Sequence, residues 1–221
     1  MSAFYPPIDN HSQLVARRSG SLNGFVRIAP LCLALMGIFF TPKTWAKEER
    51  WECNYDNKLF SFYCGPGSTA TGGSSSAYGN TNKASGGGSS AVGYTNTASG
   101  QDSSAVGSNN TASGEESSAV GYKNNAKGKN SSAVGSNNTA SGAQSTAVGY
   151  QNNATQDNVQ VFGGQNNYSY NNSTVTVGTD SVALGYKNNY KYQGEVTVGS
   201  QSSSVGVLNN ASAGNSSAMG Y

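Results

Sequence analysis

Residues 89–102 read SSAVGYTNTASGQD, and the chain repeats this unit with a fixed stride of fourteen. The first half recurs as SSAYG at 75–79, as SSAVG at 103–107, 117–121 and 131–135, and as STAVG at 145–149. The second half carries an x-A-x-G marker, so a glycine stands at every seventh position from 79 to 149. Self-similarity at a short fixed period predicts a stacked architecture in which each unit packs on its neighbours.

Each half-repeat is a short alternating stretch closed by a residue that can adopt positive φ, as in Ser90-Ala91-Val92-Gly93. This pattern predicts a strand and a turn, because a helix would lose about 1 kcal/mol at each glycine. Two strands and two turns per fourteen residues predict one coil of an all-β parallel solenoid, with coils about 4.8 Å apart. We expect valine to destabilise the fold at the corner glycines, which are Gly79, Gly93, Gly107, Gly121, Gly135 and Gly149.

An asparagine stands three residues after each of these six glycines and after Gly163. The series is Asn82, Asn96, Asn110, Asn124, Asn138, Asn152 and Asn166. Asparagine tolerates left-handed backbone and can bond to nearby backbone groups, so these residues fit turns. Stacked copies could equally form a ladder of amide hydrogen bonds. The sequence leaves both interpretations open.

A single solenoid of this composition has a thin core. Each coil offers about one valine and two alanines, which hardly offsets a backbone ordering cost of roughly 1–2 kcal/mol per residue. Ser90 and Val92 face one way along the strand and Ala91 faces the other. Symmetric association would hide a stripe of small residues, and we expect this interface at Ala77, Ala91, Ala105, Ala119, Ala133 and Ala147.

The SSAVGYTNTASG repeats resemble the head repeats of trimeric autotransporter adhesins, the YadA-like or haemagglutinin-repeat family. The match is clear over roughly 75–163, and weaker copies continue to 221. The resemblance implies a left-handed parallel β-roll in each chain, three chains around one axis, and attachment of a bacterium to host surfaces or to other bacteria. It also implies that the middle alanine faces the trimer centre, while its flanking residues fill the roll. Ser90 and its equivalents depart from the family, in which this flank is usually aliphatic.

The first 46 residues have the pattern of a secretory signal peptide with an extended leader. An apolar run at 28–40 follows Arg17, Arg18 and Arg27, and Thr44-Trp45-Ala46 is an acceptable cleavage site. The run is shorter than the roughly 20 residues of a membrane span, although an uncleaved signal anchor is an alternative. Four of the 13 Lys/Arg and one of the 11 Asp/Glu lie in the leader, so the exported part has a net charge of −1. This near-neutral surface makes nucleic acid or an acidic membrane an unfavourable partner.

Residues 47–73 differ from the repeats and are rich in large aromatics. Cys53 and Cys64 predict a disulfide in an exported protein, which would close a hairpin-like loop. We interpret this segment as a cap over the first coil, whose strand edge would otherwise be an open template. Alternatively, the aromatics form a ligand-binding tip.

The regular repeats occupy 74–158, and degenerate repeats with longer loops follow at 159–221. The Val-rich stretches at 175–178, 182–185 and 196–199 predict better-buried strands. The added residues hold tyrosines among asparagines, at Tyr168, Tyr170, Tyr190 and Tyr192. These loops are candidates for recognition or are plain spacers. The sequence stops at Tyr221 as a new coil opens, and we therefore expect a truncated head without a stalk or an anchor.

A second, longer repeat of 28 residues is superimposed on the 14-residue repeat. The residue after the corner glycine alternates between tyrosine and serine, which places Tyr94, Tyr122 and Tyr150 on every second coil, about 10 Å apart. Evenly spaced tyrosines suit weak, repeated contact with an extended polymer, so these three are candidate ligand contacts. Duplication of a 28-residue unit without a selected role is the rival explanation.

The residues do not favour an enzyme. The only histidine, His11, lies in the leader, and no cofactor or metal is expected. The sequence therefore predicts a homotrimeric surface adhesin head that binds a host extracellular-matrix protein or cell-surface receptor, or that agglutinates sister cells. We expect it at the cell surface or outer membrane if an anchor is supplied, and otherwise secreted or periplasmic, without membrane insertion by this chain. The alternatives are a passive spacer or surface coat, a non-functional truncated fragment, and a disordered Gly/Ser/Asn-rich segment.

Overall fold

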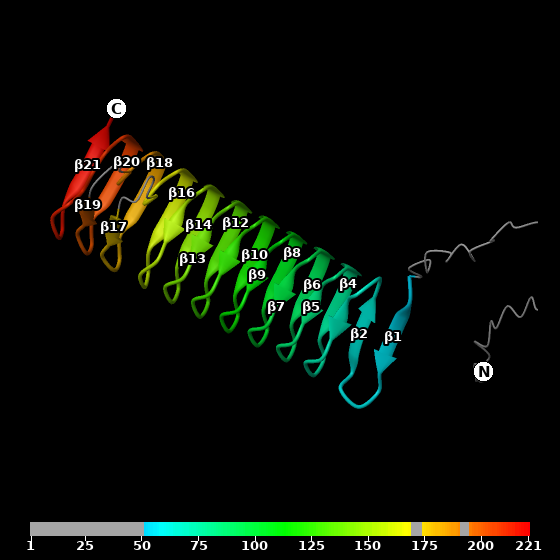
Figure 1. The fold of residues 1–221 in the computed structure, drawn as a ribbon. Coiled ribbons are helices and arrows are strands. Elements are labelled where there is room, and N and C mark those ends of the chain that lie inside the picture. The colour runs from blue at the N-terminus through cyan, green and yellow to red at the C-terminus, as the bar shows by residue number, and fades with distance from the viewer. Residues whose placement is uncertain (1–50, 169–173, 191–194) are drawn as a thin grey trace, which may run out of the picture. The chain divides into compact units, whose positions relative to one another are not determined.

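A computed structural model describes residues 51–168, 174–190 and 195–221, and every regular element in these ranges is a β-strand. The expected leader at 1–46, Tyr170 and Tyr192 lie outside the described residues. The described strands stack coil upon coil along one direction (Figure 1). In the regular part, each strand pairs in parallel with the strand fourteen residues further on. The predicted all-β parallel solenoid is therefore confirmed.

One wall of the solenoid is a 12-stranded sheet of the longer strands. Its order is β1 (Cys53–Asp56), β2 (Ser61–Cys64), β4 (Ser76–Asn80), β6 (Ser90–Tyr94), β8 (Ser104–Ser108), β10 (Ser118–Tyr122), β12 (Ser132–Ser136), β14 (Thr146–Tyr150), β16 (Gln160–Gly164), β18 (Val182–Tyr186), β20 (Ser203–Val207) and β21 (Ser217–Gly220). Only β1 runs antiparallel to its neighbour.

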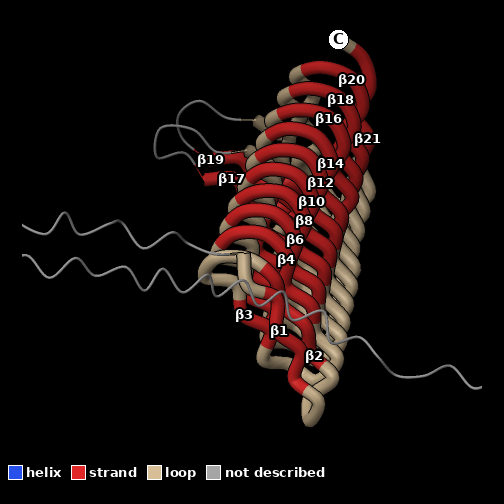
Figure 2. The backbone as a smooth tube through the Cα atoms, turned by 90° about the vertical axis from the view of Figure 1, so that its right-hand side faces the viewer, coloured by secondary structure: helices blue, strands red, loops and turns tan. Residues whose placement is uncertain are grey.

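The other wall is a seven-stranded sheet of two-residue strands. It comprises β3 (Thr69–Ala70), β5 (Lys83–Ala84), β7 (Thr97–Ala98), β9 (Thr111–Ala112), β11 (Asn125–Ala126), β13 (Thr139–Ala140) and β15 (Asn153–Ala154). The remaining strands, β17 (Thr174–Val177) and β19 (Glu195–Val198), form a separate parallel pair. Figure 2 shows the coils stacked one upon another, with β17 and β19 away from the longer strands.

The corner glycines have two different physical roles. Gly107 has φ +115°, a conformation that L-residues rarely adopt, and a Cβ there would lie 2.1 Å from the Gly121 carbonyl oxygen. Gly114 has no such φ, yet its Cβ would lie 2.0 Å from the carbonyl oxygen of Gly128 in the next coil. The first glycine of each coil is therefore needed both for its turn conformation and for close stacking, whereas the second is needed for close stacking alone.

The asparagine series forms a buried amide ladder inside the roll. The Nδ2 of Asn124 donates to Asn110 Oδ1 at 3.1 Å, and Asn138 Nδ2 donates to Asn124 Oδ1 at 3.0 Å. The same Asn124 amide donates to the carbonyl oxygens of Val120 and Gly135 at 2.8 and 2.7 Å. Of the two interpretations that the sequence left open, the ladder is present from Asn82 to Asn166.

The expected role of the alanine stripe was wrong. The alternation along the strand holds, but its two faces are exchanged: Ala91 is 0% exposed within one chain, whereas Val92 is 36% exposed. An alanine of the opposite wall, Ala98, belongs to the same buried cluster, so the narrow roll admits only small side chains. The proposed interface residues Ala77, Ala91, Ala105, Ala119, Ala133 and Ala147 all lie inside the roll, with no surface left for another chain.

The expected cap at 47–73 contains the first coil as well. Strand β2 pairs in parallel with β4, and β3 pairs with β5, so the stack already begins at Ser61. The first coil is preceded by β1, which pairs antiparallel with β2 and brings Cys53 opposite Cys64. These two cysteines form a disulfide with a Cα–Cα distance of 4.0 Å.

The later coils keep the long-strand register despite their extra residues. Gly163 pairs with Gly185, and Gly185 pairs with Gly206, although 22 and 21 residues separate them. Val177, Val196 and Val198 are buried, as expected for the Val-rich stretches, whereas Leu184 is 47% exposed. The added length enters at one corner, next to β17 and β19.

Candidate functional site

A continuous line of apolar side chains runs along the outer face of the long-strand sheet. Strand register places these side chains directly above one another from coil to coil. We call this line the aliphatic column, after the valines that form most of it. It consists of Tyr78, Val92, Val106, Val120, Val134, Val148, Phe162, Leu184, Val205 and Met219. Val92, Val106 and Val120 are each more than a third exposed. The column is therefore an apolar stripe that one chain alone leaves in water.

The tyrosines predicted as ligand contacts lie two residues beyond the aliphatic column. Tyr94 pairs with Ser108, and Ser108 pairs with Tyr122, so the ring recurs on every second coil, as predicted. Tyr94, Tyr122 and Tyr150 are 55%, 44% and 49% exposed. We call these three residues the tyrosine column. Its phenol groups are accessible and rest on paired strands.

Two lysines that the sequence analysis did not single out accompany the aromatic rings. Lys123 Nζ lies 5.0 Å from the centre of the Tyr122 ring. Lys187 Nζ lies 5.2 Å from the Tyr186 ring centre and 5.1 Å from that of Tyr190. A cation at this distance from a ring face is attracted by the ring quadrupole. The signal in the sequence is the Tyr-Lys pair, which occurs at 122–123, 186–187 and 190–191.

The longer coils add a second aromatic group. The rings of Tyr168 and Tyr190 stack with centroids 6.3 Å apart and planes 9° apart. Strand register places Tyr186 beside Gly164 and, one coil earlier, Gly164 beside Tyr150. Tyr186 therefore continues the tyrosine column into the degenerate part of the roll.

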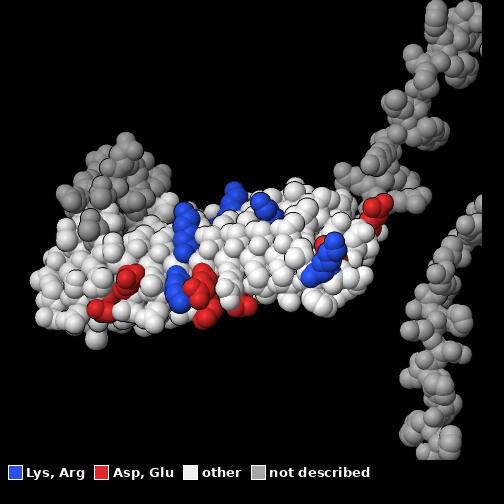
Figure 3. All heavy atoms as spheres, turned by 90° about the horizontal axis from the view of Figure 1, so that it is seen from below, with Lys and Arg blue, Asp and Glu red and all other residues white. Residues whose placement is uncertain are grey.

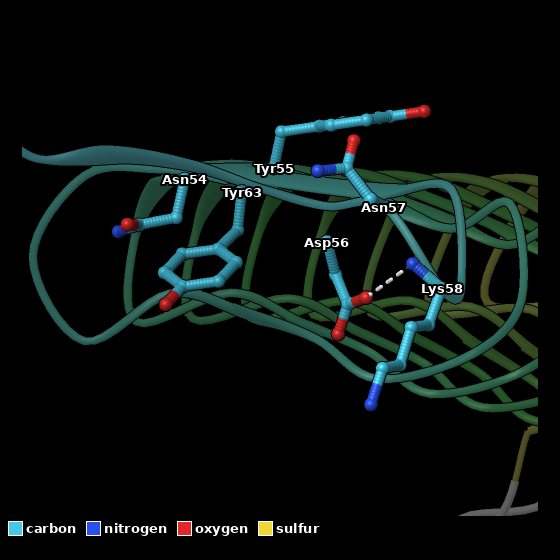
Figure 4. A pocket seen from close by; sticks show the side chains of 6 residues that line it. All are labelled: Asn54, Tyr55, Asp56, Asn57, Lys58 and Tyr63. Carbon is cyan, nitrogen blue, oxygen red and sulfur yellow. Dashed lines mark hydrogen bonds between the residues drawn. The ribbon is translucent and has the colours of Figure 1, made fainter.

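The N-terminal hairpin carries a shallow pocket beside β1. Its lining residues are Asn54, Tyr55, Asp56, Asn57, Lys58 and Tyr63. Figure 4 shows Tyr55 on one side of the hairpin and Tyr63 with Asp56 on the other. Asp56 Oδ1 accepts hydrogen bonds from the backbone N–H groups of Lys58 and Leu59 at 2.8 and 3.1 Å, which fixes the turn. The pocket is thus bordered by exposed aromatic, amide and charged groups.

Charges are few and scattered over the face drawn in Figure 3. In the described part of the chain, the one ion pair joins Lys129 Nζ to Glu115 Oε1 at 3.0 Å, across two adjacent coils. The hydrogen bond to Glu115, together with the charge of that carboxylate, raises the pKa of Lys129 above its usual value of 10.5. The described residues contain no cluster of His, Cys, Asp and Glu that could hold a metal ion. Among them there is also no helix long and apolar enough to cross a membrane.

The repeat matches a known family model, described as YadA head domain repeat (2 copies), over residues 84–110, 112–138 and 140–159. This match supports a YadA-like head over residues 84–159. The recognised segment contains the ladder residues from Asn96 to Asn152 and all three residues of the tyrosine column. No curated protein matches this chain.

The YadA-like head belongs to a family of adhesins rather than enzymes, and proteins of this family are exported to the bacterial surface. YadA-like heads are in general trimeric autotransporter adhesins. The geometry agrees with a binding role, because the accessible groups described above are repeated apolar and phenolic side chains on a rigid stack.

Proposed function

We propose that this chain forms a homotrimeric adhesin head, in which the aliphatic columns of three copies meet around one axis. The observation that carries the proposal is the line of partly exposed valines along the paired strands. Monomeric soluble proteins rarely leave a long contiguous apolar patch in water. Each Å² of apolar surface removed from water stabilises the assembly by about 25 cal/mol, so the gain in free energy accumulates over every coil.

Because of the repeat, the same contact between copies can recur in every coil. All three copies have the same coil spacing, so a contact made by Val106 in one coil recurs at Val120 in the next. The flanking outward residues Ser104 and Ser118 are small and half-buried, which allows close approach of a second sheet. The trimer thereby supplies the burial that the narrow alanine core of one roll lacks.

We further propose that the tyrosine column is the adhesive surface for a host extracellular-matrix protein or a cell-surface receptor. Tyrosine combines apolar area with a phenolic hydroxyl and loses little conformational freedom on binding. Contacts about 10 Å apart on each of three chains would raise the strength of weak individual interactions. Lys123 adds a positive charge beside the second ring of the column.

The test is to replace Tyr94, Tyr122 and Tyr150 together by serine, the residue that occupies the same position in the intervening coils. Binding to immobilised matrix proteins such as collagen, fibronectin and laminin should fall at least about tenfold, with an unchanged circular dichroism spectrum. The matched gain-of-function variant is Ser108→Tyr with Ser136→Tyr, which fills the gaps and should strengthen binding.

A passive spacer or surface coat is the second candidate, since a uniform stack of coils also projects other segments. Equal binding by the native chain and the triple serine variant would contradict the tyrosine column. Absence of binding by the native trimer across the matrix panel would favour the spacer.

A further inference from the structure

Among the described residues, no strand pairs with the outer edge of β1 at the N-terminal end of the roll. Strand β1 is the terminal strand of the 12-stranded sheet, and all four of its residues are exposed. Figure 1 shows β1 at the end of the stack, beyond β2 and β4. We propose that the edge of β1 pairs antiparallel with β1 of a second head, so that two heads join tip to tip. This inference rests on the proposed adhesive function and assigns a site to contact between sister cells.

The hydrogen-bond alternation of the hairpin determines which groups face the open edge. Gly65 N–H donates to the Glu52 carbonyl at 3.0 Å, so residues 52 and 65 form a hydrogen-bonded pair. The next pair, Cys53 and Cys64, has the short Cα separation of a non-bonded pair, 4.0 Å. Alternation then makes Tyr55 and Phe62 a non-bonded pair as well. The N–H and C=O groups of Cys53 and Tyr55 therefore point away from β2.

A two-fold axis at Tyr55 uses these groups. In an antiparallel pair centred on Tyr55, each Tyr55 N–H donates to the Tyr55 carbonyl of the second copy. The interface is then isologous, because the same four residues form both halves. Since the strands lie across the stacking direction, the added pair simply continues the stack of strands from one head into the next.

The side chains suit this register. Centring on Tyr55 brings Glu52 of one copy beside the 57–60 turn of the other, which carries Lys58, twice by symmetry. Tyr55 lies on the face opposite Tyr63 and Asp56 (Figure 4) and meets its symmetry mate there. The exposed Trp51 lies two residues before β1, and its ring centroid is 6.2 Å from that of Tyr78. Complementary charge and apolar contact thus coincide with free hydrogen-bonding groups.

The charge register gives a complementation test on the full chain. Glu52→Lys places Lys opposite Lys58 of a second copy, and Lys58→Glu places Glu opposite Glu52. Each variant alone should lose self-association of head-coated beads by about tenfold or more. A mixture of the two variants restores opposite charges at both positions and should cluster again, as should the double variant Glu52→Lys with Lys58→Glu. Lys127→Glu and Asp102→Lys are matched controls with the same charge changes on exposed residues far along the roll.

The outcomes separate this site from the adhesive surface. Clustering of the mixed beads, with mutant-only beads remaining dispersed, supports pairing of β1 with its own copy. Loss of clustering without rescue in the mixture overturns the proposal and indicates a different partner for the tip. It is also overturned if native beads stay dispersed or if the single variants cluster like the native head. Matrix binding of the tip variants should equal that of the native chain, so a failure of the tyrosine column would leave this result unaffected.

Discussion

The regular coils at 74–158 and the longer coils at 159–221 both place glycine at the close-stacking corner, as at Gly142 and Gly178, and they differ from the coil where they meet. At the close-stacking corner, Gly142 has no room for a side chain, because its Cβ would lie 1.9 Å from the Gln156 carbonyl oxygen. One coil later the same position is occupied by Gln156, whose side chain is exposed. In the part of the chain that the structure describes, the short-strand sheet ends at β15 (Asn153–Ala154).

Because Gln156 occupies the same corner as Gly142, glycine at this corner is required by the close approach of the next coil rather than by the turn itself. The core shows the same dependence. Val161 is fully buried at the position of Ala147, where the opposite wall of two-residue strands has ended. In the longer coils a second buried amide contact, from Asn189 Nδ2 to Asn167 Oδ1 at 2.8 Å, supplements the ladder at the corner where residues are added.

The largest effect is expected from alanine at a close-stacking glycine. Gly114→Ala forces a Cβ to within 2.0 Å of the Gly128 carbonyl oxygen, a backbone atom that cannot move without shifting the next coil. We expect a loss of at least about 3 kcal/mol of unfolding free energy, or failure to fold. Urea unfolding followed by circular dichroism measures the difference. The matched control is Gly87→Ala, whose Cβ would meet its nearest atom at 3.8 Å, and a similar loss there would contradict the explanation.

A smaller but still large effect is expected in the amide ladder. Asn124→Ala removes five side-chain hydrogen bonds and leaves the Val120 and Gly135 carbonyls without their amide donor. Because each buried group left unsatisfied costs about 1–3 kcal/mol, we expect a loss of about 3–5 kcal/mol in urea unfolding.

Asn188→Ala, in the longer coils, removes three side-chain hydrogen bonds and should cost less. Asn125→Thr is the control next to Asn124, since threonine stands there in the neighbouring coils and the Asn125 Oδ1 is buried without a partner. Equal losses of unfolding free energy for Asn124→Ala and Asn125→Thr would show that the ladder asparagine contributes no more to stability than its neighbour.

The smallest effect is expected at the surface ion pair. Both side chains of the Lys129–Glu115 pair are about half exposed, so Lys129→Met should leave Tm nearly unchanged at neutral pH. The raised pKa of Lys129 means that any stabilisation is present below pH 10.5 and fades as pH rises through the folded-state pKa. Thermal melts of native and variant chains across pH 7–11 measure this. A large gap at pH 7 would mean that the pair matters more than its exposure implies.

The period of fourteen was sufficient to predict the parallel solenoid, the corner glycines and the alternation of Ala91 with Val92. It was insufficient to predict which of these two residues faces the interior, because both are apolar and only the width of the roll decides which one fits. That width is determined by Ala98 on the opposite wall, a contact that no local pattern reveals.

At some corners the residue types did not predict the backbone conformation. Thr95 and Lys123 adopt left-handed backbone at φ 55° and 53°, although neither residue type favours it. The stack imposes this conformation from coil to coil. The Tyr-Lys pairs were visible in the sequence, but their significance depends on ring and ammonium lying together in space.

The most direct test of the account is the mass of the full chain in solution, measured by light scattering coupled to size-exclusion chromatography. The account predicts a mass of three chains for the native protein. It also predicts monomers with unchanged β-sheet circular dichroism for Val106→Lys with Val120→Lys, because these valines lie outside the roll. A native protein that is folded and monomeric, or a double lysine variant that remains trimeric, would contradict it.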